Sequence, residues 1–234
     1  MFILGEIVSY LEMCTEEHCS LQRGMNYRLP SGRTVILMSR RPNAPYVDRV
    51  EDEGRTIVYE GHDLPRSSDL RDPKTVDQEA QTPSGKLTQN GMFERAALQW
   101  RAETREAELI VVYEKLREGV WVFNGTFRLA NAWREQSAGR QVFKFRLELL
   151  SDSTDDGREV IGADRELEHN RVIPSEVKVE VYKRDRGQCV RCAATDNLHF
   201  DHILPFSRGG TSLRTENIQL LCARHNLEKA ARIE

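Results

Sequence analysis

The stretch that decides the fold of this chain is residues 189–229, CVRCAATDNLHFDHILPFSRGGTSLRTENIQLLCARHNLEK. It holds three of the five cysteines and three of the six histidines of the chain. Two pairs within it, Cys189-x2-Cys192 and Cys222-x2-His225, have the spacing of zinc knuckles. Four soft or borderline ligands in two such pairs close tetrahedrally around Zn²⁺. Because a closed four-ligand site leaves no position for water, we predict a structural zinc ion, one per chain.

A second set of polar residues lies around the knuckles and suits oxygen-ligated metal chemistry. Asp201-His202 follows an apolar-alternating segment, and Asn217 and Asn226 come later. Imidazole is a general base near neutral pH, and one carboxylate with one amide oxygen suits Mg²⁺ or Mn²⁺. If a helix begins near Cys222, then His225, Asn226 and Lys229 lie at i+3, i+4 and i+7 on the same face as Cys222. One helix can therefore serve both metals.

These residues resemble the motif of the HNH (ββα-metal) nucleases over residues 174–234. The resemblance is carried by Asp201-His202-Ile203, Pro205, Ser207–Gly210, Asn217, Leu220–Cys222, Asn226 and Lys229. It implies a strand pair and a helix that hold one divalent metal against the scissile phosphate. By position, His202 is the general base, Asp201 and Asn226 hold the metal, and Asn217 braces the loop. The family often has His at the third motif position, where this chain has Asn226.

The rim of such a site needs positive charge, and the candidates for phosphate contacts are Arg208, Arg224 and Lys229. Two other interpretations stay open for the same stretch. Two knuckles without catalysis would form a zinc-ribbon binding module. His199, between Leu198 and Phe200, is either a further ligand or an ordinary strand residue.

Composition places the chain among soluble globular proteins. Its 234 residues are 39% apolar and 30% charged, which allows one large domain or two ordinary ones. No segment approaches the about 20 apolar residues of a membrane span, and the first residues lack the pattern of a signal peptide. We therefore expect a cytoplasmic protein without membrane contact, in which Cys14 and Cys19 are reduced thiols.

The net charge is −3, which is unusual for a protein that binds nucleic acid. Residues 171–234 carry +3 and residues 1–170 carry −6. Because non-specific binding to DNA depends mainly on Lys and Arg, the acidic first part should recognise its ligand through shape and a pocket.

The first 150 residues are predicted to be strand-rich with two helices, at residues 7–20 and 91–105. Strands are expected at residues 33–38, 55–59, 109–113 and 143–149, and residues 61–90 form a long, functional loop. Asn124-Gly125 is typical of a type I′ turn, so residues 121–129 are predicted to be a hairpin.

Several segments of this part resemble SRA (SET and RING associated) domains. They are Ala44–Asp48, Val58–Asp63, Asp77-Gln78, Leu87–Gly91, Val122–Leu129 with Trp133, and Val142–Leu147. The resemblance implies a curved, β-barrel-like domain that flips a methylated cytosine out of duplex DNA. By position, Tyr46 and Tyr59 would sandwich the base, with Asp48 and Glu60 at its polar edge. The alternative is that both tyrosines are ordinary strand aromatics.

A linker separates the two predicted parts. Residues 151–157 are small and acidic without apolar side chains, and Pro174 begins a predicted helix that ends at Gly187. We therefore predict an α+β protein with an SRA-like reader at residues 1–150, a linker at 151–173 and a small zinc-stabilised ββα-metal domain at 174–234.

The resulting hypothesis is a type IV-like, modification-dependent endonuclease that cleaves double-stranded DNA containing 5-methylcytosine or a related base. One rival is an HNH endonuclease that reads ordinary sequence. Another is a non-cleaving reader that uses zinc only for folding. One HNH site cuts one strand, so a duplex break would require a homodimer or two independent events.

Overall fold

The structure is a computed structural model that describes residues 2–66, 72–150, 172–204 and 208–231. Its main element is an eight-stranded sheet in the order β2-β3-β6-β7-β8-β5-β4, with β1 paired to β7 outside this path. Among the strands of the described residues, β3 and β6 are the one pair that runs parallel. The strands are β1 Ile7–Val8, β2 Met25–Asn26, β3 Thr34–Met38, β4 Arg49–Glu51, β5 Thr56–Glu60, β6 Leu109–Arg117, β7 Val120–Ser137 and β8 Arg140–Leu149.

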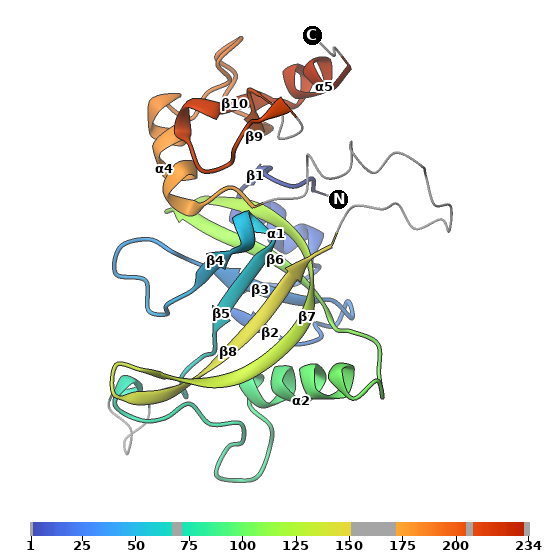
Figure 1. Cartoon of the computed structure of the whole chain (residues 1–234), viewed down its shortest axis with the longest axis vertical. Helices are drawn as coiled ribbons and strands as arrows, with labels where there is room; N and C mark the ends of the chain where they lie inside the picture. Colours follow the sequence, from blue (N-terminus) through green and yellow to red (C-terminus); the bar gives the residue numbers. More distant parts are fainter. Residues whose placement is uncertain (1, 67–71, 151–171, 205–207, 232–234) are drawn as a thin grey trace.

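The large sheet curls strongly along β7 and β8, as Figure 1 shows. Register shifts interrupt the pairing of β6 with β7 and of β7 with β8, and such bulges bend a strand and increase its twist. Helix α2 (Gln89–Arg101) begins at Thr88, whose side chain accepts a hydrogen bond from the Gly91 N–H. It buries Phe93, Ala96 and Ala97 against aromatic residues of β5 and β8, which forms the main hydrophobic core.

The predicted turn at Asn124-Gly125 is wrong, because both residues lie inside the continuous strand β7. The chain turns instead before β7 at Gly119 and after it at Ala138-Gly139, all with positive φ. Val111 of β6 pairs with Thr126 and Tyr113 pairs with Phe123, so Asn124 and Gly125 together lie opposite one residue of β6. Asn124-Gly125 therefore forms a β-bulge. Asn124 is 1% exposed there, and the bulge turns its side chain into the protein.

The first predicted helix is shorter than expected. Ser9 caps α1 (Tyr10–Glu16) through a capping box with Glu12, and the residues before it form β1 instead. The helix ends before His18, which has a positive φ of 55°. In the predicted loop at 61–90, the described residues include the short 3-10 turn Pro73–Thr75 and an isolated bridge between Gln81 and Leu87.

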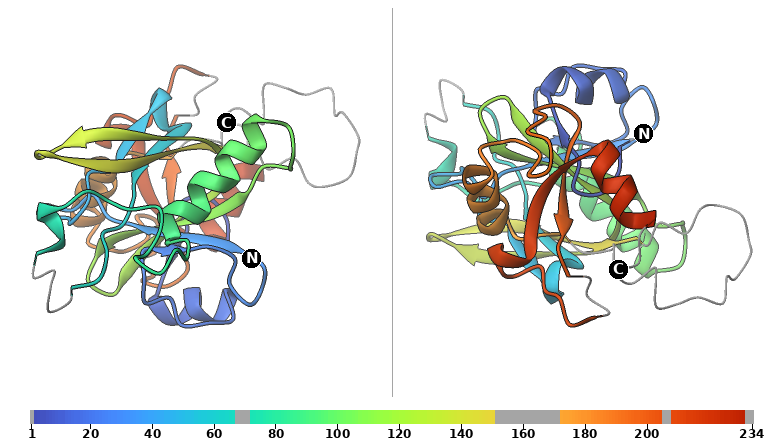
Figure 2. Two further views of the ribbon diagram at one scale, coloured as in Figure 1. Left: turned by 90° about the horizontal axis from the view of Figure 1, so that it is seen from below. Right: turned by 90° about the horizontal axis from the view of Figure 1, so that it is seen from above.

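The C-terminal part is a compact two-stranded sheet with two helices. Helix α4 (Ser175–Arg184) precedes the antiparallel pair β9 (Leu198–His202) and β10 (Ile218–Cys222), and α5 (Ala223–Ala231) follows directly. Seen from above in Figure 2, this part lies over one end of the large sheet. The fold is therefore α+β, with a large curved sheet and a small C-terminal ββα unit.

Most of the predicted linker, residues 151–171, lies outside the described residues. Its last two residues are buried: Val172 packs in the main core and donates its N–H to the Gly54 carbonyl, and Ile173 packs beneath the C-terminal part. The domain boundaries stay a prediction. Within the described ranges, no helix has the length and apolar content needed to cross a membrane.

Candidate functional site

The four predicted zinc ligands meet in one cluster in the C-terminal part. Sγ of Cys189, Cys192 and Cys222 and a ring nitrogen of His225 all lie within 4.8 Å of one another. The Sγ atoms of Cys192 and Cys222 are 3.8 Å apart, and His225 Nδ1 is 3.3 Å from Cys189 Sγ. Two thiolates bound at about 2.3 Å to one tetrahedral Zn²⁺ would be about 3.8 Å apart. The donor set and its spacing therefore fit zinc.

The surroundings of Cys189 favour the thiolate that zinc requires. Burial raises the pKa of this thiol, but backbone hydrogen bonds from Cys222 and Arg191 and the contact with His225 lower it to about 6. His199 is not part of the cluster. It is 4% exposed on β9, and its Nδ1 has no hydrogen-bond partner among the described residues.

Asp201 and His202 occupy the end of β9, opposite Gln219 and Ile218 of β10. Asp201 Oδ2 accepts hydrogen bonds from Gln219 Nε2 at 3.0 Å and from Lys229 Nζ at 2.6 Å. His202 Nε2 lies 2.8 Å from the hydroxyl oxygen of Ser212, which is 5% exposed. The side chains of Asp201 and His202 are thus both held by neighbours from other segments of the chain.

Asn217 ties together the loop between β9 and β10. Its Oδ1 accepts from the Leu204 N–H at 2.8 Å, and its Nδ2 donates to the carbonyls of Leu204 and Thr211, each at 3.0 Å. Main-chain atoms on both sides of the loop are therefore held by one amide. These hydrogen bonds are those that bracing the loop requires, and the role of Asn217 in the reaction stays a prediction.

The charged residues predicted to contact phosphate lie in three different settings. Lys229 of α5 forms an ion pair with Asp201 and also donates to the His202 carbonyl. Arg224 is on the exposed surface of α5 with its Nε 3.8 Å from Glu228. Arg208 is exposed in the loop after the strand. Asn226 lies on α5, one turn before Lys229, and the roles of all four stay predictions.

The two tyrosines of the predicted base pocket do not face each other across an open slot. Tyr59 is 1% exposed in the main core, and its hydroxyl lies 2.7 Å from His62 Nε2. The His62 ring stacks on Tyr46, with ring centroids 4.5 Å apart and planes at 11°. Lys74 Nζ also lies over the Tyr46 ring, 4.0 Å from its centroid. His62 and Lys74 therefore cover the face of Tyr46 that the prediction assigned to a base.

His62 is fixed by contacts on several sides. Its backbone N–H donates to Asn90 Oδ1 at 2.9 Å, and its carbonyl accepts from Asn90 Nδ2 at 2.7 Å. A Cβ added at Gly24 would lie 2.3 Å from the imidazole, so this glycine leaves space for the ring. Burial lowers the pKa of His62 to about 4, so the imidazole is neutral at pH 7.

Asp48 and Glu60 lie beside this group as a buried polar cluster. Asp48 accepts the Glu60 N–H at 2.9 Å, and Glu60 Oε2 accepts from Lys144 Nζ at 2.9 Å. Burial is the largest cause that raises the pKa of Asp48, to about 7, against the opposing effects of the Glu60 amide and the Lys144 charge. Near neutral pH this carboxyl group can therefore both donate and accept a hydrogen bond.

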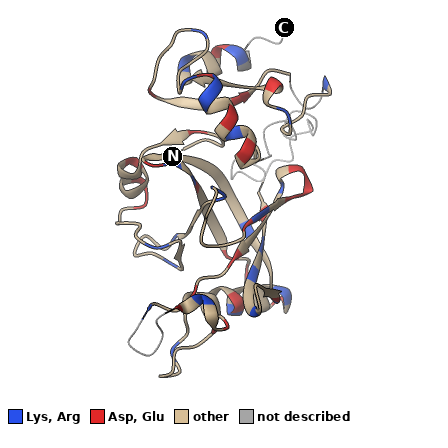
Figure 3. Ribbon diagram, turned by 90° about the vertical axis from the view of Figure 1, so that its left-hand side faces the viewer, with Lys and Arg blue, Asp and Glu red and all other residues tan. Residues whose placement is uncertain are grey.

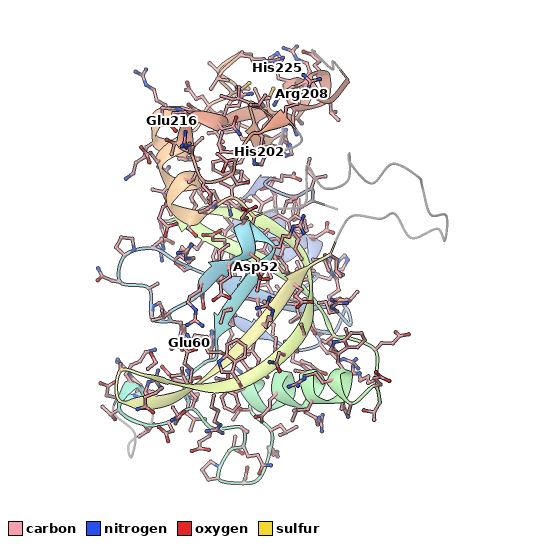
Figure 4. All side chains as sticks on the ribbon, in the orientation of Figure 1. Asp52, Glu60, His202, Arg208, Glu216 and His225 are labelled. Carbon is pink, nitrogen blue, oxygen red and sulfur yellow. The ribbon has the colours of Figure 1, made fainter. Side chains whose placement is uncertain are left out.

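The two candidate sites lie far apart along the molecule. Figure 4 labels His202 and His225 in the C-terminal part and Glu60 in the large sheet toward the other end of the long axis. Acidic and basic residues are interspersed along the ribbon of both parts (Figure 3).

The comparison with known families finds a match for the part of the chain that holds the Cys₃His cluster and the Asp201-His202 strand. Residues 189–232 match the HNH endonuclease family. The HNH match spans β9, β10 and α5 and includes all four cluster residues. A search of curated proteins finds no significant match.

Three solved structures are similar to the chain at low identity. The SUVH5 SRA domain in complex with hemimethylated CG DNA is 21% identical, with 63% of this chain and 88% of that chain covered and a TM-score of 0.42. The DNA modification-dependent restriction endonuclease AspBHI is 15% identical, with 64% and 75% covered and a TM-score of 0.47. KRYPTONITE in complex with mCHG DNA and SAH is 18% identical, with 67% and 34% covered and a TM-score of 0.42. These similarities carry no functional argument, which rests on the residues of this chain.

Sequence reasoning missed four residues at the two sites: His62, Lys144, Ser212 and Gln219. His62 follows Tyr59 by three residues in a stretch already singled out, but nothing local shows that its ring covers Tyr46. The pairing of Gln219 with Asp201 depends on the register of β9 with β10, which only the fold defines.

We call the part of the chain from residue 174 onward the HNH part. Loss of one zinc ligand should release the metal and unfold it. Cys192 is exposed, so Cys192→Ser removes a ligand with little effect on packing. Structural zinc can supply about 10 kcal/mol or more of folding free energy, and the small unit has few other sources of stability. We expect metal analysis to fall from one zinc per chain to a small fraction, with loss of protease resistance from residue 174 onward. Cys14→Ser is the control, and active, folded wild type without zinc would contradict the assignment.

The acid side of the stability profile should depend on His62. Its pKa is about 4 when folded and about 6.5 when unfolded, so the unfolded chain binds the extra proton between these values. The free energy of unfolding should therefore fall as pH falls from 6.5 to 4, and His62→Gln should lose this contribution. Asp48, raised to about 7, acts in the opposite direction. Urea midpoints of wild type and His62→Gln that differ by a constant at all pH values would contradict this.

Proposed function

We propose that this chain is a metal-dependent endonuclease that acts on double-stranded DNA containing 5-methylcytosine or a related modified cytosine. The observation that carries the proposal is the HNH match on a unit where Asp201 and His202 lie beside a separate Cys₃His cluster. Because the three cysteines and His225 form a closed set of their own, Asp201 and His202 are left to take part in the reaction. The SRA-like sequence pattern and the buried polar cluster of Asp48, Glu60 and Lys144 beside Tyr59 support recognition of a flipped base.

The proton-transfer role belongs to His202. In the tautomer that the reaction needs, Nε2–H donates to the Ser212 hydroxyl oxygen and Nδ1 carries the lone pair. Nδ1 then takes a proton from the water whose oxygen attacks phosphorus, while the bond from phosphorus to the leaving oxygen breaks. Ser212 acts by orienting the ring. A neutral imidazole in this orientation is a suitable base near pH 7.

Asp201 and Asn226 would hold a divalent cation, with Lys229 close to the same oxygen. A bound Mg²⁺ or Mn²⁺ supplies stabilisation of the negative charge that develops on the leaving oxygen. Gln219 and Lys229 already orient the Asp201 carboxylate by hydrogen bonds to Oδ2. Because Lys229 neutralises Asp201 in this structure, its ammonium group becomes available for a phosphate oxygen only when another cation takes over that role.

Recognition by base flipping requires a change at Tyr46. A stacked pair with centroids 4.5 Å apart has no space for a third ring, so the imidazole of His62 must leave before a base can stack there. A base that enters would find the Tyr46 ring on its face and Asp48, Glu60 and Lys144 nearby as polar groups. Tyr59 contributes its hydroxyl rather than a face, because its ring is buried.

Cleavage should require both the modification and His202. We expect wild type to cut methylated plasmid in the presence of Mg²⁺ and to leave unmethylated plasmid intact. His202→Ala should lower the rate about 10²- to 10⁴-fold, as for loss of a general base, with unchanged zinc content and DNA binding. Arg101→Ala, on the outer end of α2, is the matched control.

The rival functions give different results in this assay. Equal cleavage of both plasmids would show an HNH endonuclease that reads ordinary sequence. Methyl-dependent binding without cleavage in Mg²⁺ or Mn²⁺ would show a non-cleaving reader. Near-wild-type cleavage by His202→Ala would remove the assignment of the base.

Removal of the His62 ring should make base capture easier. The flipped base no longer has to displace an aromatic stack and a hydrogen bond, together worth about 1–2 kcal/mol, or about 5- to 30-fold in affinity. His62→Ala should therefore bind methylated duplex more tightly and raise the fluorescence of a neighbouring 2-aminopurine. Tyr46→Leu should lose that signal. Lys74→Ala removes the ammonium group that also covers the Tyr46 ring, and it shows how much of the effect is due to His62 alone. Weaker binding by His62→Ala would show that the imidazole is a permanent wall of the pocket.

A further inference from the structure

A buried ionic group joins the HNH part to the large sheet. Lys178 of α4 donates to Glu114 Oε2 of β6 at 2.7 Å and to Asn124 Oδ1 of β7 at 2.6 Å. Asn124 Nδ2 donates in turn to Glu114 Oε2 at 3.0 Å. All three residues are 1% exposed. We call Lys178, Glu114 and Asn124 the junction triad.

The junction triad fixes how α4 sits on the sheet. A buried charge is tolerated only when its partners are in place, and such groups are best known for defining register. Burial by itself would raise the pKa of Glu114, but Lys178 and the neighbouring hydrogen bonds lower it overall, so the carboxylate is charged. A shift of α4 by one turn would leave this carboxylate buried without its cation.

Apolar contacts around the junction triad supply the driving force. A single hydrophobic cluster contains Leu116 and Val122 of the large sheet together with residues of the HNH part. The HNH part contributes Val177 and Val181 of α4, Leu198 and Phe200 of β9 and Leu220 of β10, and Ile173 joins them from the end of the linker. Two domains move independently by default unless a hydrophobic interface holds them together, and here apolar residues of both parts share one buried cluster.

Main-chain hydrogen bonds also cross the junction. Strand β1 pairs with β7 of the large sheet, and the residues just before it contact β9. Glu6 bridges to His199, and the Gly5 carbonyl accepts the Phe200 N–H at 3.1 Å. Gly5 has a φ of 82°, and a Cβ there would lie 3.1 Å from the Phe200 carbonyl oxygen. The N-terminal segment therefore connects the two sheets edge to edge.

We infer that the base-reading part and the HNH part form one rigid body, so that the cut falls at a fixed distance from the recognised base. This inference rests on the proposed function, but the docking itself rests only on the junction. Residues 151–171 then connect the two parts along the chain without setting their separation. The fixed distance is the separation between Tyr46 and His202 within this body.

A tethered nuclease would behave differently. Ten added Gly/Ser residues have a root-mean-square reach of about 17 Å, which corresponds to about 5 nucleotides at about 3.4 Å per nucleotide of one strand. Insertion of such a segment between Asp155 and Asp156 would then spread the cuts over several further positions. In a docked nuclease the same insertion leaves the cut positions unchanged.

The test maps cut positions at nucleotide resolution on a duplex with one 5-methylcytosine. Wild type and the insertion variant should give the same positions within one nucleotide. The charge-reversed Lys178→Glu places two carboxylates in the junction, and in the insertion background it should broaden or abolish the pattern. Lys178→Met with Glu114→Gln removes both charges, keeps the apolar contacts and should retain the wild-type positions. Cuts that spread in the insertion variant alone would overturn the inference.

A second measurement tests docking without DNA. All three tryptophans, Trp100, Trp121 and Trp133, precede the linker, whereas the zinc ligands follow it. Tryptophan fluorescence and zinc release to a chromogenic chelator should show the same urea midpoint in the zinc-loaded full chain. Separate midpoints would overturn the rigid body. Coincident midpoints in a protein that ignores methylation would remove the proposed function and leave the docking established.

Discussion

The meeting of Cys189, Cys192, Cys222 and His225 in one cluster is the constraint around which the HNH part is arranged. Cys189 and Cys192 come from the turn after α4, and Cys222 and His225 come from the end of β10 and the start of α5. A metal that binds all four would join segments thirty residues apart in a unit that is too small for a full core. Strand β9, which carries Asp201 and His202, is held between these fixed points.

The order of the elements explains how one short segment carries two sets of ligand-type residues of different character. Sulfur and imidazole ligands gather on one side of the β10–α5 corner, whereas Asp201 and the loop braced by Asn217 lie at the end of β9. Thiolates select zinc, and carboxylate and amide oxygens select harder cations. The same helix reaches both sites, because Lys229 contacts Asp201 two turns after Cys222.

Buried polar groups have different tasks in the two halves of the molecule. At the junction, Lys178, Glu114 and Asn124 satisfy one another and define register. Around Tyr46, His62 and Asp48 have pKa values shifted toward their neutral forms by burial. The Glu60–Lys144 ion pair lies beside these neutral groups, so the cluster combines one buried pair of opposite charges with uncharged polar side chains.

The sequence by itself determined the Cys₃His cluster, the Asp201-His202 strand, the helix after Pro174 and the alternating strand β8. Each of these follows from spacing or periodicity within a few residues, which local geometry converts directly into structure. Only the tertiary structure decided that Asn124-Gly125 forms a bulge rather than a turn, that His62 covers Tyr46, and that Lys229 pairs with Asp201. These features join residues distant in sequence, and their energies come from burial and pairing that no local pattern records.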